Sequence, residues 1–579
     1  MSSAILSRPV ELAFAPGGVN SNTGGSLSNL LTRSQRVYTG SALVIIALVI
    51  VGAAFPEAFG RFANSALDSV SHVFGWLYLI SVFGFVIFLV GLAFSRYGKI
   101  RLGEPYSEPE YSFFSWVSML LAAGFGVGLV FYGLAEPILH YLNPPYNDMP
   151  GSTPESARYA IQYSFFHWGI SQWAGFSIVG LIIAYFQFRK KKSGLVSTVM
   201  EPMTDKLPAG ARQPTSDALN IFAVVATVMG VATSLGLGVL QINGGLNQMF
   251  GVPDTTLWKF IILGVMCACY TMSSYSGLDK GIQWLSNINL ALCLGLMGWV
   301  LSTGPTIFIL NTIVVGIGDY MENFIAMSLR MNPFEDTGEN WISSWTVFYW
   351  AWVIAWSPFV GTFVARISKG RTIREYVMGV LIVPPLLACG FIGVFGGAAL
   401  HMELFGDAAG TLTSAVDENI TSALFTFFEM MPFTNVLSIL AMCLIFVFLV
   451  TSADSASYIV AQMTDEGSLE PPLYKRLSWG LMISAICLTL IVAGGLKGLQ
   501  TGSLLAALPF LVILYFMVFV LTRELRDDRR RMLMDLYEKH ESMPVGADAF
   551  EARDILNDVW DDDDYEDADD EGKRSRSSG

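Results

Sequence analysis

The sequence predicts an all-α integral membrane protein with twelve transmembrane helices, and three observations support this fold class. The 579 residues are 53% hydrophobic and only 14% charged, which is too apolar for a soluble multidomain protein. A spanning helix needs about 20 mostly apolar residues, and the chain offers roughly twelve such runs. The basic residues between these runs are also unevenly distributed, as in a multi-pass membrane protein.

The first forty residues (1–40) are polar and rich in Gly and Ser, and they lack the compact charged and apolar regions of a signal peptide. We expect them to form a cytoplasmic N-terminal arm. The transmembrane domain follows at 41–522, with an additional interfacial helix at 306–329. The predicted spans are 41–60, 74–95, 111–140, 158–188, 217–248, 257–276, 281–303, 342–366, 374–400, 434–461, 475–496 and 499–522.

Lys and Arg collect in alternate loops, and basic residues near the ends of spans stay in the cytoplasm. They occur around 96–101, 189–192, 366–374 and 475–476, and again after Thr522. The intervening loops at 141–157 and 401–433 contain no Lys or Arg. The sequence therefore predicts an even number of spans with both termini in the cytoplasm.

Two predicted spans carry residues that interrupt helices. Span 111–140 contains Gly124, Gly126 and Gly128, and each glycine costs about 1 kcal/mol relative to alanine in a helix interior. In span 342–366, Pro358 lacks a backbone N–H and leaves the carbonyl of Ile354 without its helical donor. These are the third and eighth spans, so they indicate two inverted five-helix repeats with a transport site near the midplane. The alternative is that these residues only pack helices or make kinks.

Aromatic side chains gather at mid-membrane depth in two spans. One narrow stripe of span 342–366 carries Trp345, Trp352, Trp356, Phe359 and Phe363. An arc of about 140° on span 158–188 carries Trp168, Trp173 and Phe176. Tryptophan usually gathers at the membrane surface instead, whereas ring faces bind quaternary ammonium groups, which have no N–H to donate. The pattern predicts an aromatic binding site, with packing of a helix interface as the alternative.

Hydroxyl groups in two other spans suit a cation. Thr451 and Ser452 are neighbours within span 434–461, and Asp454 follows them. Sodium prefers oxygen ligands, and hydroxyls beside backbone carbonyls supply them without a fixed charge. Thr227 offers another hydroxyl in span 217–248. Two alternatives stay open: the hydroxyls bond to their own helix, and Asp454 lies at the cytoplasmic end of its helix instead of on a pathway.

Enzyme motifs are missing from the sequence. It has no phosphate-binding Gly-x-x-x-x-Gly-Lys loop and no His-Glu-x-x-His motif, and its five histidines are scattered. The six cysteines fall inside apolar segments without a metal-binding spacing, so we expect them to be packed hydrophobic side chains. We expect neither an enzyme nor a bound cofactor, and we interpret His167 as a structural residue.

Four motifs together resemble the betaine/choline/carnitine transporter family. They are Ala122 to Gly128, His167 to Phe176, Ser344 to Val353, and Thr451-Ser452, and the agreement in order and spacing runs from about residue 35 to 525. The resemblance implies a LeuT-like core of two inverted repeats (111–303 and 342–522) after two peripheral helices (41–95). It also implies a homotrimer in the bacterial plasma membrane, with sodium as the coupling ion. The implied activity is sodium-coupled import of a betaine- or ectoine-type compatible solute for osmoprotection.

The resemblance also implies a substrate site. Its members are the aromatic residues Trp168, Trp173, Phe176, Trp352 and Trp356, with Val353 and the glycines Gly124, Gly126 and Gly128. Phe176 stands where the betaine carriers have tyrosine, and Val353 stands where they have a second adjacent tryptophan. Gly128 replaces an aspartate typical of choline carriers. The resemblance therefore favours a small zwitterionic solute, such as glycine betaine, ectoine or proline, whose carboxylate would lie against backbone N–H groups of the glycines.

Two sodium sites are implied in the same way. The first comprises Ala122, Phe125, Phe448, Thr451 and Ser452, and the second comprises Thr227 and Phe359. A further threonine of the second site is replaced by Val231, so the number of coupled ions stays open. The alternative functions are sodium-independent exchange of related solutes, as in the carnitine branch, and a receptor or channel without coupled transport.

Residues 523–579 form an acidic C-terminal tail. Arg523 to Gly579 holds 19 acidic and 10 basic residues and contributes −9 to the formal net charge of −14. Residues 523–540 have the alternating charge of an amphipathic helix, whereas Asp561 to Glu571 is typical of disorder. The family's best-known osmosensing member has a basic tail, but anionic lipid would repel this acidic one. We expect membrane lipid and the solute as partners, no nucleic acid, and a tail that is either regulatory or simply solvated.

Overall fold

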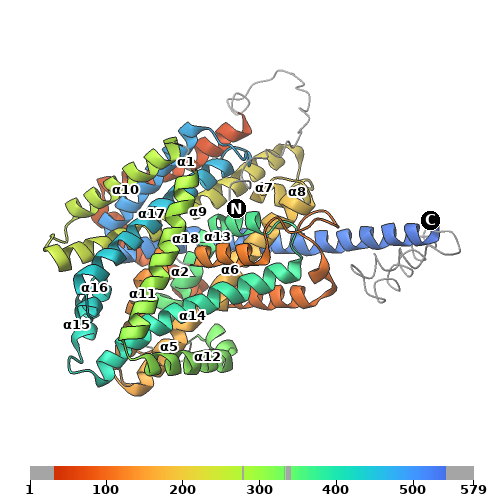
Figure 1. Ribbon diagram of the computed structural model, residues 1–579. Helices are drawn as coiled ribbons and strands as arrows, with labels where there is room; N and C mark the ends of the chain where they lie inside the picture. The colour runs from red at the N-terminus through yellow and green to blue at the C-terminus, as the bar shows by residue number, and fades with distance from the viewer. Residues whose placement is uncertain (1–31, 125, 277–278, 332, 334–340, 543–579) are drawn as a thin grey trace.

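The computed structural model describes residues 32–124, 126–276, 279–331, 333 and 341–542. Within these ranges every regular element is a helix, and strand-like pairing is limited to one bridge between Arg101 and Thr372. Figure 1 shows the helices packed side by side, with the end of the C-terminal helix projecting away from them. The predicted all-α fold is confirmed. Most of the arm 1–40 and the tail beyond Ser542 lie outside the described residues.

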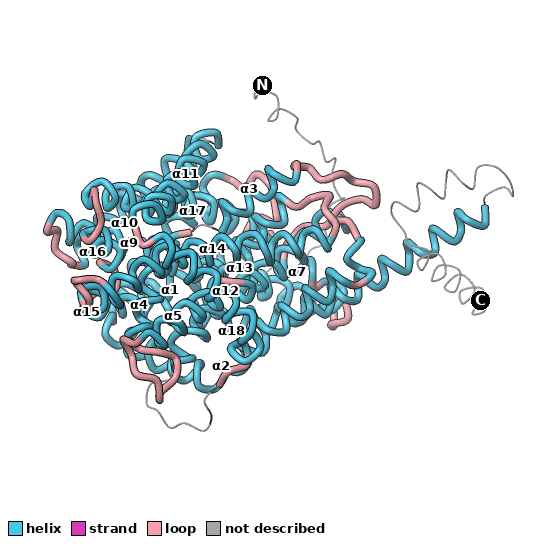
Figure 2. Tube along the Cα trace, turned by 60° about the horizontal axis from the view of Figure 1, so that its bottom comes forward, coloured by secondary structure: helices cyan, strands magenta, loops and turns pink. Residues whose placement is uncertain are grey.

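Helices make up nearly the whole body of the protein, as Figure 2 shows in cyan. Their bounds are α1 (Arg33–Ala54), α2 (Pro56–Phe94), α3 (Phe113–Gly124), α4 (Val127–Leu142), α5 (Pro154–Trp168), α6 (Ile170–Ala184), α7 (Val196–Val199), α8 (Glu201–Thr204), α9 (Ala209–Phe250), α10 (Thr256–Ser276), α11 (Asp279–Thr303), α12 (Thr306–Ser328), α13 (Phe348–Ile367), α14 (Ile373–Phe405), α15 (Thr411–Glu418), α16 (Ala423–Glu429), α17 (Thr434–Met463) and α18 (Leu473–Ser542). A 3-10 turn, η2 (Arg96–Lys99), and two π-helical turns, η3 (Tyr185–Arg189) and η4 (Ser343–Val347), lie beside them.

Nine of the described helices are long and apolar enough to cross a membrane, or ten if one bent pair counts as a single span. That pair is Asn287–Thr303 and Thr306–Ser328, and its bend of 114° fits the helix predicted to lie at the interface. The predicted spans 475–496 and 499–522 are merged in α18, and span 111–140 is divided into two short helices. The protein is therefore a multi-pass membrane protein, while the number of twelve spans and the inverted repeat stay predictions.

The first predicted span contains a helix break, and the second predicted span is the C-terminal part of a longer helix. α1 ends at Ala54, and α2 starts at Pro56 and runs through 39 residues to Phe94. Proline is favoured in the first turn of a helix, where its missing N–H would have had no partner. The polar residues between 61 and 73 continue α2 instead of forming a connection.

The predicted break in span 111–140 is confirmed. α3 ends at Gly124, α4 begins at Val127, and Gly126 between them is extended, with φ −144° and ψ 169°. Phe125 lies outside the described residues. The ends of two helices meet here, and helix ends leave carbonyl and N–H groups without partners inside the helix. Backbone groups at this point are therefore able to bind a ligand.

The predicted interruption at Pro358 is wrong, because α13 continues through it. The proline deprives the Ile354 carbonyl of its usual donor, but the Ser357 hydroxyl donates to that oxygen at 2.8 Å. The Thr362 hydroxyl also donates to the Pro358 carbonyl at 2.6 Å. Local hydroxyls thus satisfy the helix around the proline.

A break that was not predicted divides span 158–188 at Gly169. This residue has φ −85° and ψ −144°, and it separates α5 from α6. The phenol oxygen of Tyr320 on α12 accepts a hydrogen bond from the Ile170 backbone N–H at 3.0 Å. A side chain from a distant helix thus satisfies the start of α6, and no local pattern indicates it.

α18 contains one non-helical residue, Gly495, with φ 56° and ψ −133°. Only glycine adopts this conformation readily, so the kink lies at a residue that permits it. It falls between the two spans predicted at 475–496 and 499–522. The two predicted helices therefore exist, joined without a loop.

The basic loops lie together at one end of the fold. Leu102 N donates to Arg371 O at 2.8 Å, and Gly370 N donates to Leu102 O at 2.7 Å. Arg189 Nη1 donates to Gly103 O at 3.2 Å. Three of the loops that the charge pattern assigned to one side are thus in contact, while their position in the cytoplasm stays a prediction.

Candidate functional site

Five aromatic side chains predicted to bind substrate form one continuous chain of ring contacts. Trp168 at the end of α5 lies edge-on to Trp352 of α13, with 6.1 Å between the ring centroids. Trp352 stacks on Trp356 at 5.8 Å, with the two planes only 7° apart. Phe176 of α6 contacts Trp356 at 5.7 Å and Trp173 at 5.5 Å. We call these five residues, which three helices bring together, the aromatic box.

Only part of the aromatic stripe predicted on span 342–366 belongs to the box. Phe359 continues the stack one ring beyond Trp356, at 6.2 Å. Trp345 instead contacts His140 of α4 at 4.5 Å. Phe363 is 38% exposed on the outside of the helix. The stripe therefore combines residues of the aromatic box with packing and surface residues.

The glycines of the broken helix lie directly against the box. A Cβ added at Gly128 would overlap the Trp352 ring and lie 3.0 Å from Cη2 of Trp168, whereas one added at Gly126 would lie 3.6 Å from Cη2 of Trp356. Gly124 is the last residue of α3. The absence of a side chain at Gly128 thus lets two indoles approach the backbone near the helix break.

Val353 forms part of the support of the box. It is buried, and a Cβ added at Gly175 of α6 would lie 2.5 Å from its Cγ1 atom. Gly175 is next to Phe176, so the small pair Val353 and Gly175 lets α13 and α6 approach each other closely. Val353 therefore fits the close contact between α13 and α6 at Gly175.

A small cavity joins Trp356 of the box to two of the predicted sodium ligands, Ser452 and Phe359. Trp356, Gly126 and Ser452 line it, together with Phe359 and Val231. Ser452 lies on α17, so the cavity connects that helix to the break between α3 and α4. The structure thus places Ser452 and Phe359 at one cavity with the box.

Other predicted sodium ligands are bonded within their own helices. The Thr451 hydroxyl lies 2.9 Å from Val447 O and 3.2 Å from the carbonyl of Phe448, a largely buried residue. The Thr227 hydroxyl donates to Ala223 O at 2.7 Å. Ala122 lies on α3, and Phe125 falls outside the described residues. The alternative of local hydrogen bonding is therefore observed for both threonines.

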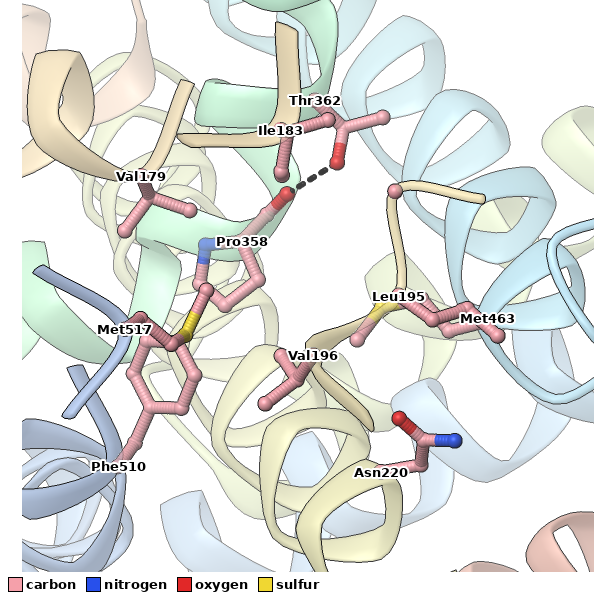
Figure 3. Close-up of a pocket in the computed structure, with 11 residues that line it drawn as sticks. Val179, Ile183, Leu195, Val196, Asn220, Pro358, Thr362, Met463, Phe510 and Met517 are labelled. Carbon is pink, nitrogen blue, oxygen red and sulfur yellow. Dashed lines mark hydrogen bonds between the residues drawn. The ribbon is translucent and has the colours of Figure 1, made fainter. Parts of the chain in front are cut away.

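A second small cavity lies beside Pro358 (Figure 3). Its walls are mostly apolar, from Val179 and Ile183 of α6 to Phe510 and Met517 of α18. Asn220 at its edge is satisfied, because its Nδ2 donates to Ser197 Oγ at 2.9 Å. Leu195 and Val196 connect this cavity to the basic loop at 189–192.

Two other polar residues of the predicted constellations have clear partners. Asp454 is buried and accepts hydrogen bonds from Ser273, at 2.9 Å, and from Ser274, both on α10. It therefore joins α17 to α10. Ser234 of α9 accepts a hydrogen bond from Trp352 Nε1 at 3.3 Å and so belongs to the surroundings of the box.

Glu136, a fully buried carboxylate on α4, was not predicted from the sequence. Trp168 Nε1 donates to its Oε2 at 2.8 Å, and the Tyr349 hydroxyl donates to the same oxygen. His167 Nδ1 lies 2.7 Å and His140 Nε2 lies 3.1 Å from its Oε1. An acidic residue inside an apolar span is itself a signal of function and could have revealed it. We call these five residues the Glu136 cluster.

The Glu136 cluster includes three groups that are able to ligate a metal. One atom each from Glu136, His140 and His167 lies within 4.8 Å of the other two. The same contacts are at hydrogen-bond distances, and Thr346 Oγ1 lies 3.0 Å from the remaining His167 nitrogen. Hydrogen bonding therefore explains the arrangement of the cluster without an ion.

The six cysteines are unpaired, as predicted, but not all are packed inside. Cys293, Cys389 and Cys487 are buried, whereas Cys443 is exposed. A membrane protein turns apolar side chains toward lipid, so exposure of a small apolar residue on a spanning helix is ordinary.

Comparisons with known proteins identify the family of this chain. Residues 36–530 match the model of the betaine/carnitine/choline family of transporters. The chain is 50% identical over 508 residues to an ectoine/hydroxyectoine transporter of Virgibacillus pantothenticus, covering 88% of this chain and 99% of that protein. It is 43% identical over 490 residues to the glycine betaine transporter OpuD of Bacillus subtilis, covering 84% and 94%. It is also 35% identical over 498 residues to the high-affinity choline transport protein of Escherichia coli, covering 85% and 72%. The chain is therefore a transporter and not an enzyme, and it belongs to the betaine/carnitine/choline family.

Proposed function

We propose that this protein imports a small zwitterionic compatible solute by sodium-coupled alternating access. The observation that carries the proposal is the contact between the aromatic box and the broken helix, because Gly128 lies against two indoles and Gly126 faces a third. Ring faces bind a cationic group, and N–H groups at the start of a helix bind a carboxylate. Together they match the two charges of a zwitterion.

The class of solute follows from the residues around the box. Gly128 offers no carboxylate to balance a solute that is purely cationic, and the ring of Trp352 leaves no room for one. The solute must then bring its own negative charge. Two relatives are named as transporters of ectoine and glycine betaine, so these two solutes are our first candidates.

The proposed coupling to sodium rests on Ser452. Its cavity is also lined by Gly126 and Trp356, so an ion bound there would lie next to both the helix break and the box. An ion that binds only the solute-competent arrangement of the break would increase the population of that arrangement. Sodium would thereby raise the affinity for the solute, and the solute would raise the affinity for sodium.

The remaining architecture is proposed with the function. We propose twelve spans, two inverted five-helix repeats and a trimer in the bacterial plasma membrane, as the family resemblance implies. The basic loops and both termini are placed in the cytoplasm by the positive-inside rule. The cavity beside Pro358 lies toward those loops, and its apolar walls suit a path by which solute leaves the box.

The test is uptake of labelled ectoine, glycine betaine, proline and choline into proteoliposomes, with and without an inward sodium gradient. Accumulation of a zwitterion that requires the gradient supports the proposal. Uptake driven only by solute inside the vesicles would show exchange, and the absence of accumulation of all four solutes would favour a receptor or channel.

A matched pair of variants connects the uptake to the box. Trp352→Leu should abolish solute binding, because it removes the ring that contacts both Trp168 and Trp356. Trp299→Leu makes the same change on α11, where the indole contacts Phe433 outside the box. Equal affinity in the two variants would contradict the proposed site.

A further inference from the structure

We propose that Glu136 sets the preference of the aromatic box for a positively charged head group, by making the Trp168 ring more electron-rich. This inference rests on the proposed function, since it concerns how the same box recognises its solute. It assigns an electrostatic role to a residue behind the box, where no contact with the solute is needed.

The Glu136 carboxylate is buried behind the aromatic box. Glu136 has no exposed surface, and Trp168 connects it to the box, donating its indole N–H at 2.8 Å. The benzene end of the same indole points away from that N–H and toward Gly128, where a Cβ would lie 3.0 Å from Cη2. The indole thus lies between the carboxylate and the broken helix, with one end at each.

Hydrogen-bond donors surround the Glu136 carboxyl group. All four close partners of Glu136 offer donors: an indole N–H, a phenol O–H and two imidazole rings. None of them is a permanently charged group such as Lys or Arg. Four donors around one carboxyl group favour its ionised form in a region from which water is excluded.

The carboxylate of Glu136 alters the electron density of the Trp168 ring. The cation–π attraction is electrostatic and depends on the negative potential over the ring face. An indole that donates its N–H to a carboxylate gains electron density, and the low dielectric of the interior strengthens the effect. Tyr349 donates to the same oxygen and packs edge-on to Trp168 at 5.6 Å. The charge of Glu136 therefore acts on the box through its ring walls.

Two ligands of the same shape, one with a charged and one with a neutral head group, distinguish two possible roles of Glu136. If Glu136 only holds Trp168 in place, its loss weakens every ligand of the same shape equally. If its charge acts through the ring, the loss is larger for a cationic head group than for a neutral one. Glycine betaine and the tert-butylacetate anion form such a pair, because tert-butyl replaces trimethylammonium with nearly the same shape.

The experiment measures binding of glycine betaine and of the tert-butylacetate anion to the purified full-length protein, each by competition against labelled solute. For Glu136→Gln, which keeps the shape and removes the charge, we expect the preference for glycine betaine to fall by about three- to thirtyfold. The affinity for tert-butylacetate should change less than twofold. Equal weakening of both ligands, or an unchanged preference, would overturn the inference.

Two further variants keep the test decisive if Glu136→Gln does not fold. Glu136→Asp keeps the charge but shortens the side chain by one methylene, which withdraws the carboxylate from Trp168 Nε1, so the preference should fall as in Glu136→Gln. Tyr349→Phe removes one donor but leaves the carboxylate and Trp168 in contact, so the preference should stay within twofold of wild type. A large fall in preference in Tyr349→Phe, or an unchanged preference in Glu136→Asp, would contradict a role of the hydrogen bond between Glu136 and Trp168.

The controls distinguish this inference from the proposed function. Sodium-dependent uptake by the wild type tests the function alone and does not involve Glu136. If the wild type accumulates a zwitterion but Glu136→Gln keeps the same preference, only the inference fails. If the wild type binds no glycine betaine, the inference is overturned whatever else is transported.

Discussion

At Gly128 the missing side chain is what brings the broken helix and two indoles together. We predict that Gly128→Ala weakens solute binding by at least about tenfold, because a methyl group would overlap Trp352 and crowd Trp168. Inserting a methyl group into a packed site typically costs about 1–3 kcal/mol. Quenching of tryptophan fluorescence by the solute gives the dissociation constants.

Gly126→Ala is the matched variant for that experiment. Its added methyl group would lie 3.6 Å from Trp356, which is ordinary van der Waals contact, and its φ of −144° suits any residue. We therefore expect a clearly smaller loss than at Gly128. The opposite order of the two effects would show that the rings do not lie against Gly128 when solute is bound.

Ser452 is the residue whose position most directly tests the proposed ion site. We predict that Ser452→Ala raises the sodium concentration needed for half-maximal uptake several-fold, because it removes an oxygen from the cavity next to Gly126. The control is Ser457→Ala, since that hydroxyl is buried on the same helix and donates to Asp454 O at 2.8 Å. Sodium dependence that is unchanged in Ser452→Ala would exclude this oxygen as a ligand.

At the scale of helices, local sequence predicts some breaks and not others. The break at Gly126 is predictable because three glycines in five residues weaken the helix by themselves. The break at Gly169 depends on Tyr320, which is 151 positions away in the chain, and so no local pattern contains it. The reverse holds at Pro358, where the Ser357 hydroxyl supplies a donor to the Ile354 carbonyl in place of the N–H that proline lacks.

We predict that Gly169→Ala lowers the stability of the protein by about 1–3 kcal/mol. A methyl group would overlap the Phe165 carbonyl and lie 2.7 Å from the Tyr320 hydroxyl, so the joint between α5 and α6 would have to open. Gly390→Ala on α14 meets no atom within 4 Å and should be neutral or slightly stabilising. The melting temperatures of the two variants are measured in the same detergent. Equal values would contradict the close contact at Gly169.

At the scale of the whole molecule, the sequence predicts which helices meet in the site but not what supports them. Depth and spacing along single helices select eight aromatic residues that include the five rings of the box. The resemblance to the family, and not the spacing, singles out these five. The Glu136 cluster joins α4, α5 and α13, and its geometry exists only after these helices have packed. Local sequence likewise does not predict where the tail docks, because its partners Arg189 and Lys190 lie far from it in the chain.

The start of the C-terminal tail is bound to the end of the helix that carries part of the box. Asp528 accepts from Arg189 Nε at 2.8 Å, and Glu524 pairs with Lys190 at 2.8 Å. We predict that Asp528→Asn lowers the melting temperature, because Arg189 is mostly buried and loses its charged partner. Glu104→Gln, at an exposed pair with Lys191, should leave it unchanged, since exposed pairs contribute little. Equal effects of the two changes would show that the tail is not held by these charges.

Two truncations of the tail test whether this docking affects transport. A chain ending at Ser542 keeps Glu524 and Asp528, whereas a chain ending at Thr522 loses both and leaves Arg189 and Lys190 without these partners. Arg189 ends the π-helical turn that follows α6, and α6 carries Trp173 and Phe176. We therefore predict that only the shorter chain binds solute several-fold more weakly and responds differently to osmotic upshift in proteoliposomes. If both truncated chains match the full-length protein in affinity and in osmotic response, the docked helix has no part in transport, and the tail is a solvated extension.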